Sequence, residues 1–533
     1  MSDELMELPD GWEWTSFEEL AERIPNALKA GPFGSALKKS FYVPSGYKIY
    51  GQEQVINEDP FFGDYYIDGT RYEELKSCAV KPGDILISLV GTIGKVLILP
   101  KEIEPGIINP RLVKLSLDKI LVNNEYVKKY LESPAARDYL SKLSHGGTMD
   151  ILNLSILKTL KIPLPPLNEQ KRIVAAIESL RERSQKARSA LAAIPELCDK
   201  FRQSVLAAAF RGDLTADWRE QNPDVEPASA LLERIRLERR QRWESAELQV
   251  MTRGKVSSVN SRKKSYQEPP YNFDVFDLKN DFGVSAINNW EVAHLELLTD
   301  PVRGIPYGIV QTGEHTSGGV PTVRCGDIKN YWIDPMNLKL VAHDIDAQYL
   351  RTKLQGDEVL LAIRGTVGGV AVSTSEMKGI NISREIAMIP VLPGIERKYL
   401  MYLLASPVGS QILLKQVKGV AQSGINLADL RSFPVPIPSL EEQHEIIERI
   451  ESIHLHLNQK MQLLENALRQ LDSLDRSILA KAFRGELVEQ DPNDEPASVL
   501  LERIRVEREQ QAQGKAKKLG KKADSSTHKR DVL

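Results

Sequence analysis

The chain has few cysteines and no long apolar segment. Its 533 residues include only Cys78, Cys198 and Cys325, which lie far apart and without Cys-x-x-Cys spacing. This usage argues against a disulfide framework or a thiolate zinc site and fits a reducing cytosol. The acidic start lacks the apolar core of a secretory signal, and no run of about 18 apolar residues occurs. We therefore expect a cytoplasmic protein without a membrane span.

An excess of positive charge is also absent. The formal net charge is −3, whereas a protein that coats DNA is usually strongly basic. Any DNA binding must therefore use local patches or rely on a basic partner. Apolar residues make up 42% and charged residues 27% of the chain, as in ordinary globular proteins. At roughly 100–200 residues per domain, the length predicts three or four structural units.

Motifs for catalysis are missing too. The segment Glu268–Tyr271 resembles the Asp/Asn-Pro-Pro-Tyr motif of adenine methyltransferases, but it begins with Glu and no Phe-x-Gly-x-Gly loop precedes it. In Gly91–Lys95 only two residues separate the glycines, so the Walker phosphate loop does not match. We interpret these glycines as a turn between strands. No histidine pattern predicts a metal site. We expect no catalytic site, while an enzyme of another type stays an alternative.

The sequence does contain an internal repeat. Pro163–Gln170 recurs as Pro436–Gln443, 273 residues later (436 minus 163). Ala209–Leu214 recurs as Ala482–Leu487 at the same spacing. The segments upstream match only loosely. The Gly-Thr-x-Gly turns recur, and Asn109 with Arg111 resembles Asn381 with Arg384. The pattern indicates the duplication of a two-part unit. The sequence of the second part stayed similar in the two copies, while that of the first part diverged. General drift of both halves would leave a similar pattern.

The matched parts are predicted to be long helices. Ser439 and Glu442 form a capping box just before an apolar periodic run, and Pro195 should kink or restart the first helix. Apolar steps of three and four predict a coiled-coil seam. Antiparallel pairing of the two helices would bury both seams, and packing of each helix on its own domain is the alternative. The seam positions are Ile446, Ile450, Ile453, Leu457, Met461, Leu464, Leu468, Leu471 and Ile478 in the second helix and Ile173, Ile177, Leu180, Ala187, Leu191, Ile194, Phe201 and Val205 in the first.

The divergent parts are predicted to be mixed α/β. Short β-branched runs flanked by glycine and proline favour strands, and longer segments have helical spacing. The strands are expected at Ile85–Val90, Val96–Leu99, Val359–Ile363 and Val370–Val372, and the helical segments at Tyr126–Leu143 and Tyr399–Val417.

The order of these parts resembles the specificity subunits of type I restriction-modification systems. The resemblance rests on the two Pro-Leu/Ile-Pro-x-Leu-x-Glu-Gln motifs, each after a divergent domain, and on the Phe-Arg-Gly segments behind them. It implies an α+β fold: two similar mixed α/β target-recognition domains joined by two long antiparallel coiled-coil helices in a pseudo-two-fold repeat. The expected divisions are 1–162, first recognition domain; 163–250, first helical spacer; 251–286, linker; 287–435, second recognition domain; 436–510, second helical spacer; and 511–533, a basic disordered tail.

The resemblance also implies a function. Each domain would read one half of a split, asymmetric site in double-stranded DNA, and the helices would set the gap and dock two methyltransferase subunits. Those partners would methylate adenine with S-adenosylmethionine, and nuclease-motor subunits would cut unmodified DNA with ATP and Mg²⁺. None of these cofactors is expected in this chain.

Candidate contact residues follow from residue chemistry. Base edges favour Arg, Lys, Asn and Gln, whereas phosphates favour Lys, Arg, Ser and backbone N–H groups. Polar, glycine-rich loops supply the DNA-binding candidates: Lys38, Lys39, Thr92, Lys95 and His145 in the first domain, and Arg303, Tyr307, Arg364, Thr366, Arg384 and Gln422 in the second. The expected partner-binding residues are Glu169, Gln170, Glu442 and Gln443.

Two other readings of the architecture stay open. A stand-alone DNA-binding regulator would use the same domains without methyltransferase partners, and a structural coiled-coil adaptor would bind no DNA. Binding of another protein to the helices would distinguish the first alternative, and DNA binding would exclude the second.

Overall fold

The computed structural model describes residues 7–89, 94–144, 152–253, 265–269, 289–415, 424–507 and 510. Most of the expected linker and the whole expected tail lie outside these residues. The chain divides into two compact units that do not follow its linear order. One combines the residues up to Ala192 with those from Leu464 onward, and the other comprises Ala193–Leu463. Each unit holds one mixed α/β domain together with helical segments from both repeats.

Among the described residues, three small sheets form the domain of the first unit. One is antiparallel, one contains a parallel pair of strands, and one joins the first strand of the domain to its last. Their strands, in sheet order, are β2 (Leu28–Ala30), β9 (Leu112–Leu115), β6 (Ile85–Ser88) and β7 (Val96–Ile98); β3 (Tyr42–Val43), β5 (Tyr66–Ile67), β4 (Tyr47–Tyr50) and β8 (Gly106–Ile108); and β1 (Glu13–Thr15) and β10 (Ile162–Leu164).

The domain of the second unit repeats this plan. An antiparallel sheet, a sheet with a parallel pair, and a two-stranded sheet that joins the ends of the domain are all present, and a hairpin is added. The strands are β17 (Val370–Val372), β16 (Val359–Ala362) and β19 (Ile386–Ile389); β15 (Lys339–Val341), β12 (Val320–Val323) and β18 (Asn381–Ile382); β11 (Glu291–His294) and β20 (Pro434–Ile437); and β13 (Ile328–Lys329) with β14 (Trp332–Ile333).

Short helices cover the sheets, and the predicted helical segments are each divided in two. Pro134 and Pro407 open the second helix of each pair, because proline fits the first turn but not a helix interior. The helices of the first domain are α1 (Phe17–Leu20), α2 (Gln52–Asn57), α3 (Gly69–Glu74), α4 (Asn124–Leu131), α5 (Pro134–Ser144) and α6 (Leu154–Thr159), and those of the second are α12 (His343–Asp346), α13 (Arg397–Ala405), α14 (Pro407–Lys415) and α15 (Leu427–Arg431).

Long helices form in the matched parts of both repeats, as predicted. The first repeat supplies α7 (Leu167–Ala192) and α8 (Ile194–Phe210), which are separate because Pro195 occupies the first turn of α8. The second repeat supplies α16 (Leu440–Ala482). Two further helices of the first repeat are α9 (Ala216–Gln221) and α10 (Ala228–Arg253).

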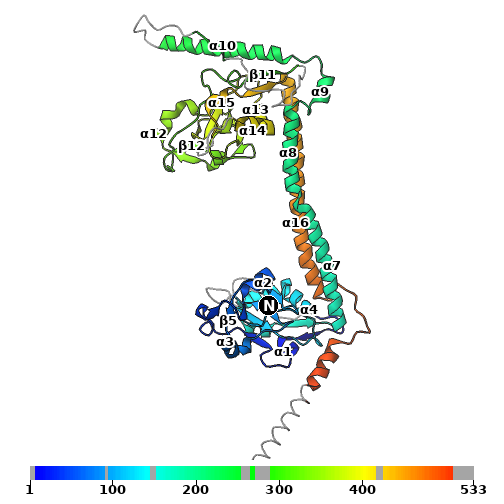
Figure 1. Cartoon of the computed structure of the whole chain (residues 1–533). Coiled ribbons are helices and arrows are strands. Elements are labelled where there is room, and N and C mark those ends of the chain that lie inside the picture. The colour runs from blue at the N-terminus through cyan, green and yellow to red at the C-terminus, as the bar shows by residue number, and fades with distance from the viewer. Residues whose placement is uncertain are drawn as a thin grey trace, which may run out of the picture. The chain divides into compact units, whose positions relative to one another are not determined.

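Antiparallel pairing takes place within each unit. In the first, Arg188 of α7 forms ion pairs with Asp472 and Asp475 of α16, while Ile173 packs in one core with Ile478. In the second unit, α8 and α16 are joined by Arg202 and Asn458, and Arg449 contacts residues that follow α8. Figure 1 shows α7 and α8 each running beside part of α16.

The seam of the first repeat departs from the prediction at one position. Phe201 is 51% exposed, whereas Cys198 is buried in its place. A new helix begins at Ile194, with Pro195 in its first turn, so the apolar spacing of α7 does not continue into α8. A different set of residues therefore faces α16. All nine predicted seam residues of α16 are buried or half-buried.

The repeated Phe-Arg-Gly segments form the ends of these helices. Gly212 has φ +80° and Gly485 has φ +75°, the left-handed conformation that glycine supplies after a helix. The preceding phenylalanines enter the domain cores: Phe210 lies edge-on to Tyr399 at 5.3 Å, and Phe483 lies edge-on to Tyr126 at 5.3 Å. The C-terminal segment of each repeat therefore packs on the domain of the other repeat.

Candidate nucleic-acid interface

A polar edge forms in the first unit where two parallel strands end. β4 and β8 are aligned so that Tyr50 lies opposite Ile108. The carboxyl ends of parallel strands meet at one edge of a sheet, where α/β proteins commonly bind ligands. The loops that follow are 51–52 and 109–111, and the Asn109 N–H donates to the Tyr50 carbonyl at 2.8 Å. We call these loops, with residues 88–89 and 94–95 beside them, the loop edge of the first domain.

Side chains at this edge form a hydrogen-bonded chain. The Gln52 amide donates to Ser88 Oγ at 2.8 Å, and Arg111 Nη1 donates to Gln52 Oε1 at 3.3 Å. The Asn109 side chain accepts the Arg111 N–H at 2.9 Å, which shapes the turn. Arg111 is exposed. The candidate set from the sequence does not include Arg111 and Gln52, although Arg111 is one of the positions at which the two repeats loosely match.

The second domain builds an equivalent edge. The Ser383 N–H donates to the Val323 carbonyl at 2.8 Å, as Asn109 does to Tyr50. Its loops are 324–326, 362–369 and 383–385, with residues 424–425 beside them. The Ile425 N–H donates to the Ile363 carbonyl at 2.9 Å, and the Leu152 N–H donates to the Leu89 carbonyl at the same distance. The backbone of the loop edge is therefore shared by the two domains.

The predicted glycine turn is confirmed in the second domain. It connects β16 and β17, with Gly365 at φ +71° and Gly368 at φ +94°. A Cβ atom at Gly365 would lie 2.8 Å from Cys325 Sγ, so this position needs both the left-handed backbone and the missing side chain. Arg364 and Thr366 are exposed in this turn.

The structure distributes the remaining DNA-binding candidates unevenly. Lys38, Lys39 and Lys95 are exposed in the first domain, and Tyr307 and Arg384 are exposed in the second. Arg384 lies at the loop edge, where its N–H donates to the Ile309 carbonyl at 2.8 Å. Three candidates fall outside the described residues: Thr92, His145 and Gln422.

The candidate Arg303 bonds to groups inside the second domain. Its guanidinium donates to Glu358 Oε1 at 2.5 Å and to the Lys353 carbonyl at 3.2 Å. The Glu358 side chain is fully buried. Burial opposes its ionisation, but hydrogen bonds from Ser373, the Gln355 N–H and Arg303 hold the pKa of Glu358 below its usual value. Arg303 thus neutralises an internal carboxylate and is not presented at the loop edge.

The four residues expected to bind partners are all buried within this chain. Glu169, Gln170, Glu442 and Gln443 are 0–3% exposed. The Gln170 amide bonds to the backbone of Asn123, Leu121 and Pro165, and the Gln443 amide bonds to that of Glu396, Gly394 and Pro438. The Glu-Gln pair therefore fastens each recognition domain to its helix.

The two glutamates accept hydrogen bonds from tryptophans near the start of each domain. Trp12 Nε1 donates to Glu169 at 3.1 Å, and Trp290 Nε1 donates to Glu442 at 2.9 Å. Burial raises the pKa of Glu169, an effect that the Trp12 hydrogen bond partly offsets. The predicted capping box is half formed: Ser439 Oγ accepts the Glu442 N–H at 3.1 Å, while the Glu442 carboxylate turns to Trp290.

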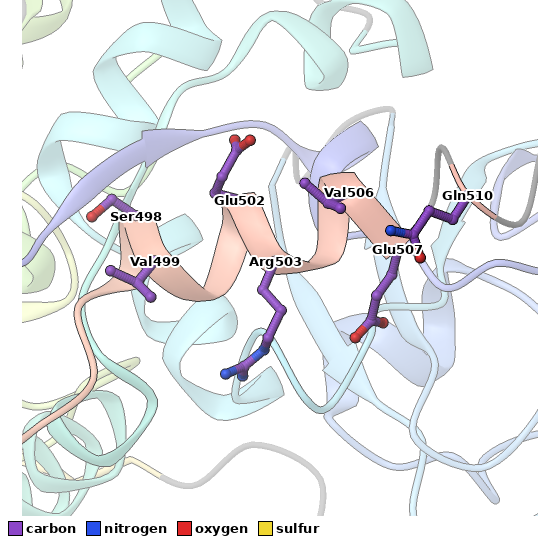
Figure 2. Close-up of a pocket in the computed structure, with 7 residues that line it drawn as sticks. All are labelled: Ser498, Val499, Glu502, Arg503, Val506, Glu507 and Gln510. Carbon is purple, nitrogen blue, oxygen red and sulfur yellow. The ribbon is translucent and has the colours of Figure 1, made fainter.

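Two hollows lie away from the loop edges. One is a shallow depression along helix 497–507, drawn in Figure 2, whose lining includes Val499, Arg503 and Val506. The other, about 780 Å³, lies in the second unit between the β13–β14 hairpin and the helices, and includes Tyr331 and His454. Burial and then the nearby Arg202 charge lower the pKa of His454.

The described residues contain neither a metal-binding cluster nor a helix that could span a membrane. Among the described residues, no group of three or more His, Cys, Asp or Glu side chains is placed to hold a metal ion. Within the same part of the chain, no helix is both long and apolar enough to cross a membrane.

Comparison with known proteins identifies the family. The family model for the type I restriction modification DNA specificity domain matches residues 9–191 and 313–467. The chain is 28% identical over 438 residues to the EcoBI specificity subunit of Escherichia coli, covering 80% of each, and 24% identical over 406 residues to the EcoKI specificity subunit of strain K12, covering 73% of this chain and 72% of that one.

Solved structures share the fold. The HsdS subunit from Thermoanaerobacter tengcongensis is similar with a TM-score of 0.53 and 18% identity, covering 91% of this chain and all of that one. A chain from a study of assembly and conformational transition in the type I restriction-modification system has a TM-score of 0.54 and 17% identity, covering 90% of this chain and all of that one. With the family matched on both domains, the chain belongs to the type I restriction-modification specificity subunits, the DNA sequence-recognition components of these systems.

Proposed function

We propose that each unit reads one half of a split, asymmetric DNA site, and that the chain directs partner subunits to it. The observation that carries this proposal is the pair of loop edges. They share one backbone arrangement, yet they present different exposed polar side chains, including Arg111 in one and Arg364 and Arg384 in the other. Two domains with the same backbone arrangement and different exposed side chains would recognise two different half-sites.

Local charge supports DNA binding despite the net charge of −3. Exposed lysines and arginines occur at or near both loop edges, and exposed cations of this kind contact phosphates in DNA complexes. Partner subunits would complete the positive surface. The chain itself would contribute no catalytic group: S-adenosylmethionine, ATP and Mg²⁺ would be bound by methyltransferase and nuclease-motor subunits, which act with it on DNA in the cytoplasm.

Partner docking is proposed on exposed apolar side chains of the helices, since the Glu-Gln motifs are buried. Leu197 and Phe201, one turn apart on one face of α8, are 60% and 51% exposed. We expect Leu197→Ser with Phe201→Ser to reduce co-purification of a methyltransferase subunit. Lys200→Ala, an exposed change on the same helix, is the control and should leave co-purification unaltered. Equal effects of both would argue against docking here.

The test of the function is a methylation map. The chain is co-expressed with a candidate methyltransferase subunit, and methyladenine is located across the host genome by single-molecule sequencing. A split motif that disappears when this chain is omitted is the expected result. Methylation that does not depend on this chain would contradict the proposal and favour a stand-alone DNA-binding regulator.

A further inference from the structure

One position at the loop edge carries opposite charge in the two domains. In the first domain the Leu89 N–H donates to the Arg111 carbonyl at 2.9 Å, and in the second the Ile363 N–H donates to the Glu385 carbonyl at 2.8 Å. The flanking bonds agree as well, because Leu112 donates to Asn109 at 3.2 Å just as Ile386 donates to Ser383 at 3.0 Å. Arg111 and Glu385 are therefore structural equivalents.

This correspondence differs from the one that the sequence favoured. The repeat comparison matched Arg111 with Arg384 and Asn109 with Asn381. Asn381 is buried and bonds to Thr352 and Asp346, so it belongs to the interior and not to the loop edge. Backbone hydrogen bonds, which do not depend on side-chain identity, place glutamate where the first domain has arginine.

Arg111 is held in position and still has free donors. Its Nη1 donates to Gln52, whose own amide donates to Ser88, so the guanidinium is oriented by a fixed neighbour. A guanidinium has five N–H donors in a planar fork, and this bond uses one. Its side chain is exposed at the edge where β4 and β8 end. A planar fork of this kind matches the O6 and N7 acceptors of guanine.

Glu385 is positioned for the opposite chemistry. Its Oε2 accepts the Cys325 N–H at 3.4 Å, and within the described part of the chain Oε1 has no hydrogen-bond partner. The residue is half-buried. A carboxylate cannot donate, and near DNA it is repelled by phosphates, so a base that donates to its second oxygen would offset this repulsion. The N4 amino group of cytosine in the major groove is such a donor.

We propose that Arg111 reads a guanine in one half-site and Glu385 reads a cytosine amino group in the other, with Gln52 as a positioning residue for Arg111. This inference rests on the proposed DNA-reading function and deepens it. Charge reversal at one shared position is then a source of the asymmetry between the half-sites. A phosphate contact at this position would instead require a cation in both domains.

The experiment measures methylation by the purified complex of the full chain with its methyltransferase subunits. The duplexes carry every single base-pair replacement in both half-sites. Arg111→Gln should reduce discrimination at one base pair of one half-site by about tenfold to a hundredfold, and Glu385→Gln should do so at one base pair of the other. Gln52→Ala should weaken discrimination at the Arg111 position alone, and Arg111→Lys should retain part of the guanine preference.

Lys119→Gln supplies the matched control. Lys119 is an exposed cation beyond the opposite end of β9 from Arg111, so its loss should leave discrimination unchanged at every base pair. If Arg111→Gln and Glu385→Gln left base discrimination unaltered, the inference would be overturned. The proposed function would still stand if the wild-type complex methylated a split motif. Uniform loss on all duplexes, or loss of folding of these variants, would also overturn the inference, since either indicates a phosphate or structural role. A wild-type complex without a chain-dependent motif would refute both.

Discussion

Removal of the Glu442 carboxylate tests how the second recognition domain is fastened to its helix. Oε2 accepts from Trp290 at 2.9 Å, and Oε1 accepts from Thr215 at 2.7 Å and from Arg219. Because the residue is 3% exposed, Glu442→Ala leaves Trp290 and Thr215 without this buried acceptor. Arg219 loses its ion-pair partner and keeps its bonds to Thr215 and the Gly212 carbonyl. Breaking a buried ion pair by removing one partner costs about 3–5 kcal/mol.

The first unit supplies a graded comparison for the same change. Glu169 accepts a hydrogen bond from Trp12 at 3.1 Å, and a hydrogen bond to a charged group contributes roughly 1.5–3 kcal/mol. Glu169→Ala should therefore destabilise its unit less than Glu442→Ala destabilises the other. Glu441→Ala, one residue away on the same helix and exposed, should change stability by at most about 0.5 kcal/mol.

Hydrogen exchange during urea titration, followed by mass spectrometry, resolves these effects unit by unit. Peptides from β11 and β20 report on the Glu442 contact, and peptides from β1 and β10 report on the Glu169 contact. We expect each variant to lose protection from exchange only in the peptides of its own unit, and the loss should be larger for Glu442→Ala. If Glu442→Ala lost no more protection than Glu441→Ala, the buried carboxylate would not fasten the domain.

Three further predictions concern the cores, pH and the spacer. Phe483→Ala should destabilise the first unit by about 3–5 kcal/mol in urea unfolding, since a buried aromatic ring is lost; an unchanged midpoint would contradict the packing of the second repeat on the first domain. Because the folded pKa of Glu358 lies below its ordinary 4.5, the stability from this ionised group is complete above that pH and is lost as the pH falls through the folded pKa; Glu358→Gln should flatten the dependence of the unfolding midpoint on acid pH, and an unaltered profile would contradict this. Insertion of four residues near Arg183 should change the preferred gap of the methylation motif and leave both half-sites intact; an unchanged gap would refute a spacer role of the helices.

The sequence predicted those features that depend on local pattern. Apolar steps of three and four placed α16 and its seam, and Pro195 placed the break between α7 and α8, because proline cannot continue a helix. Alternating β-branched runs placed β6, β7, β16 and β17. Each of these signals lies within a few residues of the structure that it causes.

Features that depend on distant partners could not be predicted in this way. Glu169 and Glu442 stand in a charged motif at a helix start and resemble surface residues, but Trp12 and Trp290, more than 150 residues away, bury and bond them. In the sequence, Arg303 resembles an exposed cation of a glycine-rich loop. In the structure it pairs with Glu358, which lies 55 residues away along the chain. The equivalence of Arg111 and Glu385 required backbone hydrogen bonds, since the side chains themselves share no chemistry.

The residues that fasten each domain to its helix are the same in both repeats, whereas the residues at the loop edge differ. Gln170 and Gln443 bond to backbone groups that both domains possess, so the same side chain serves in both copies. Residues at the loop edge bond to few internal groups, and a change there costs little folding free energy. Arginine can therefore stand at one edge and glutamate at the other without loss of the shared backbone. A duplicated fold with an invariant fastening and a variable edge can acquire two different recognition chemistries by substitutions that leave its stability intact.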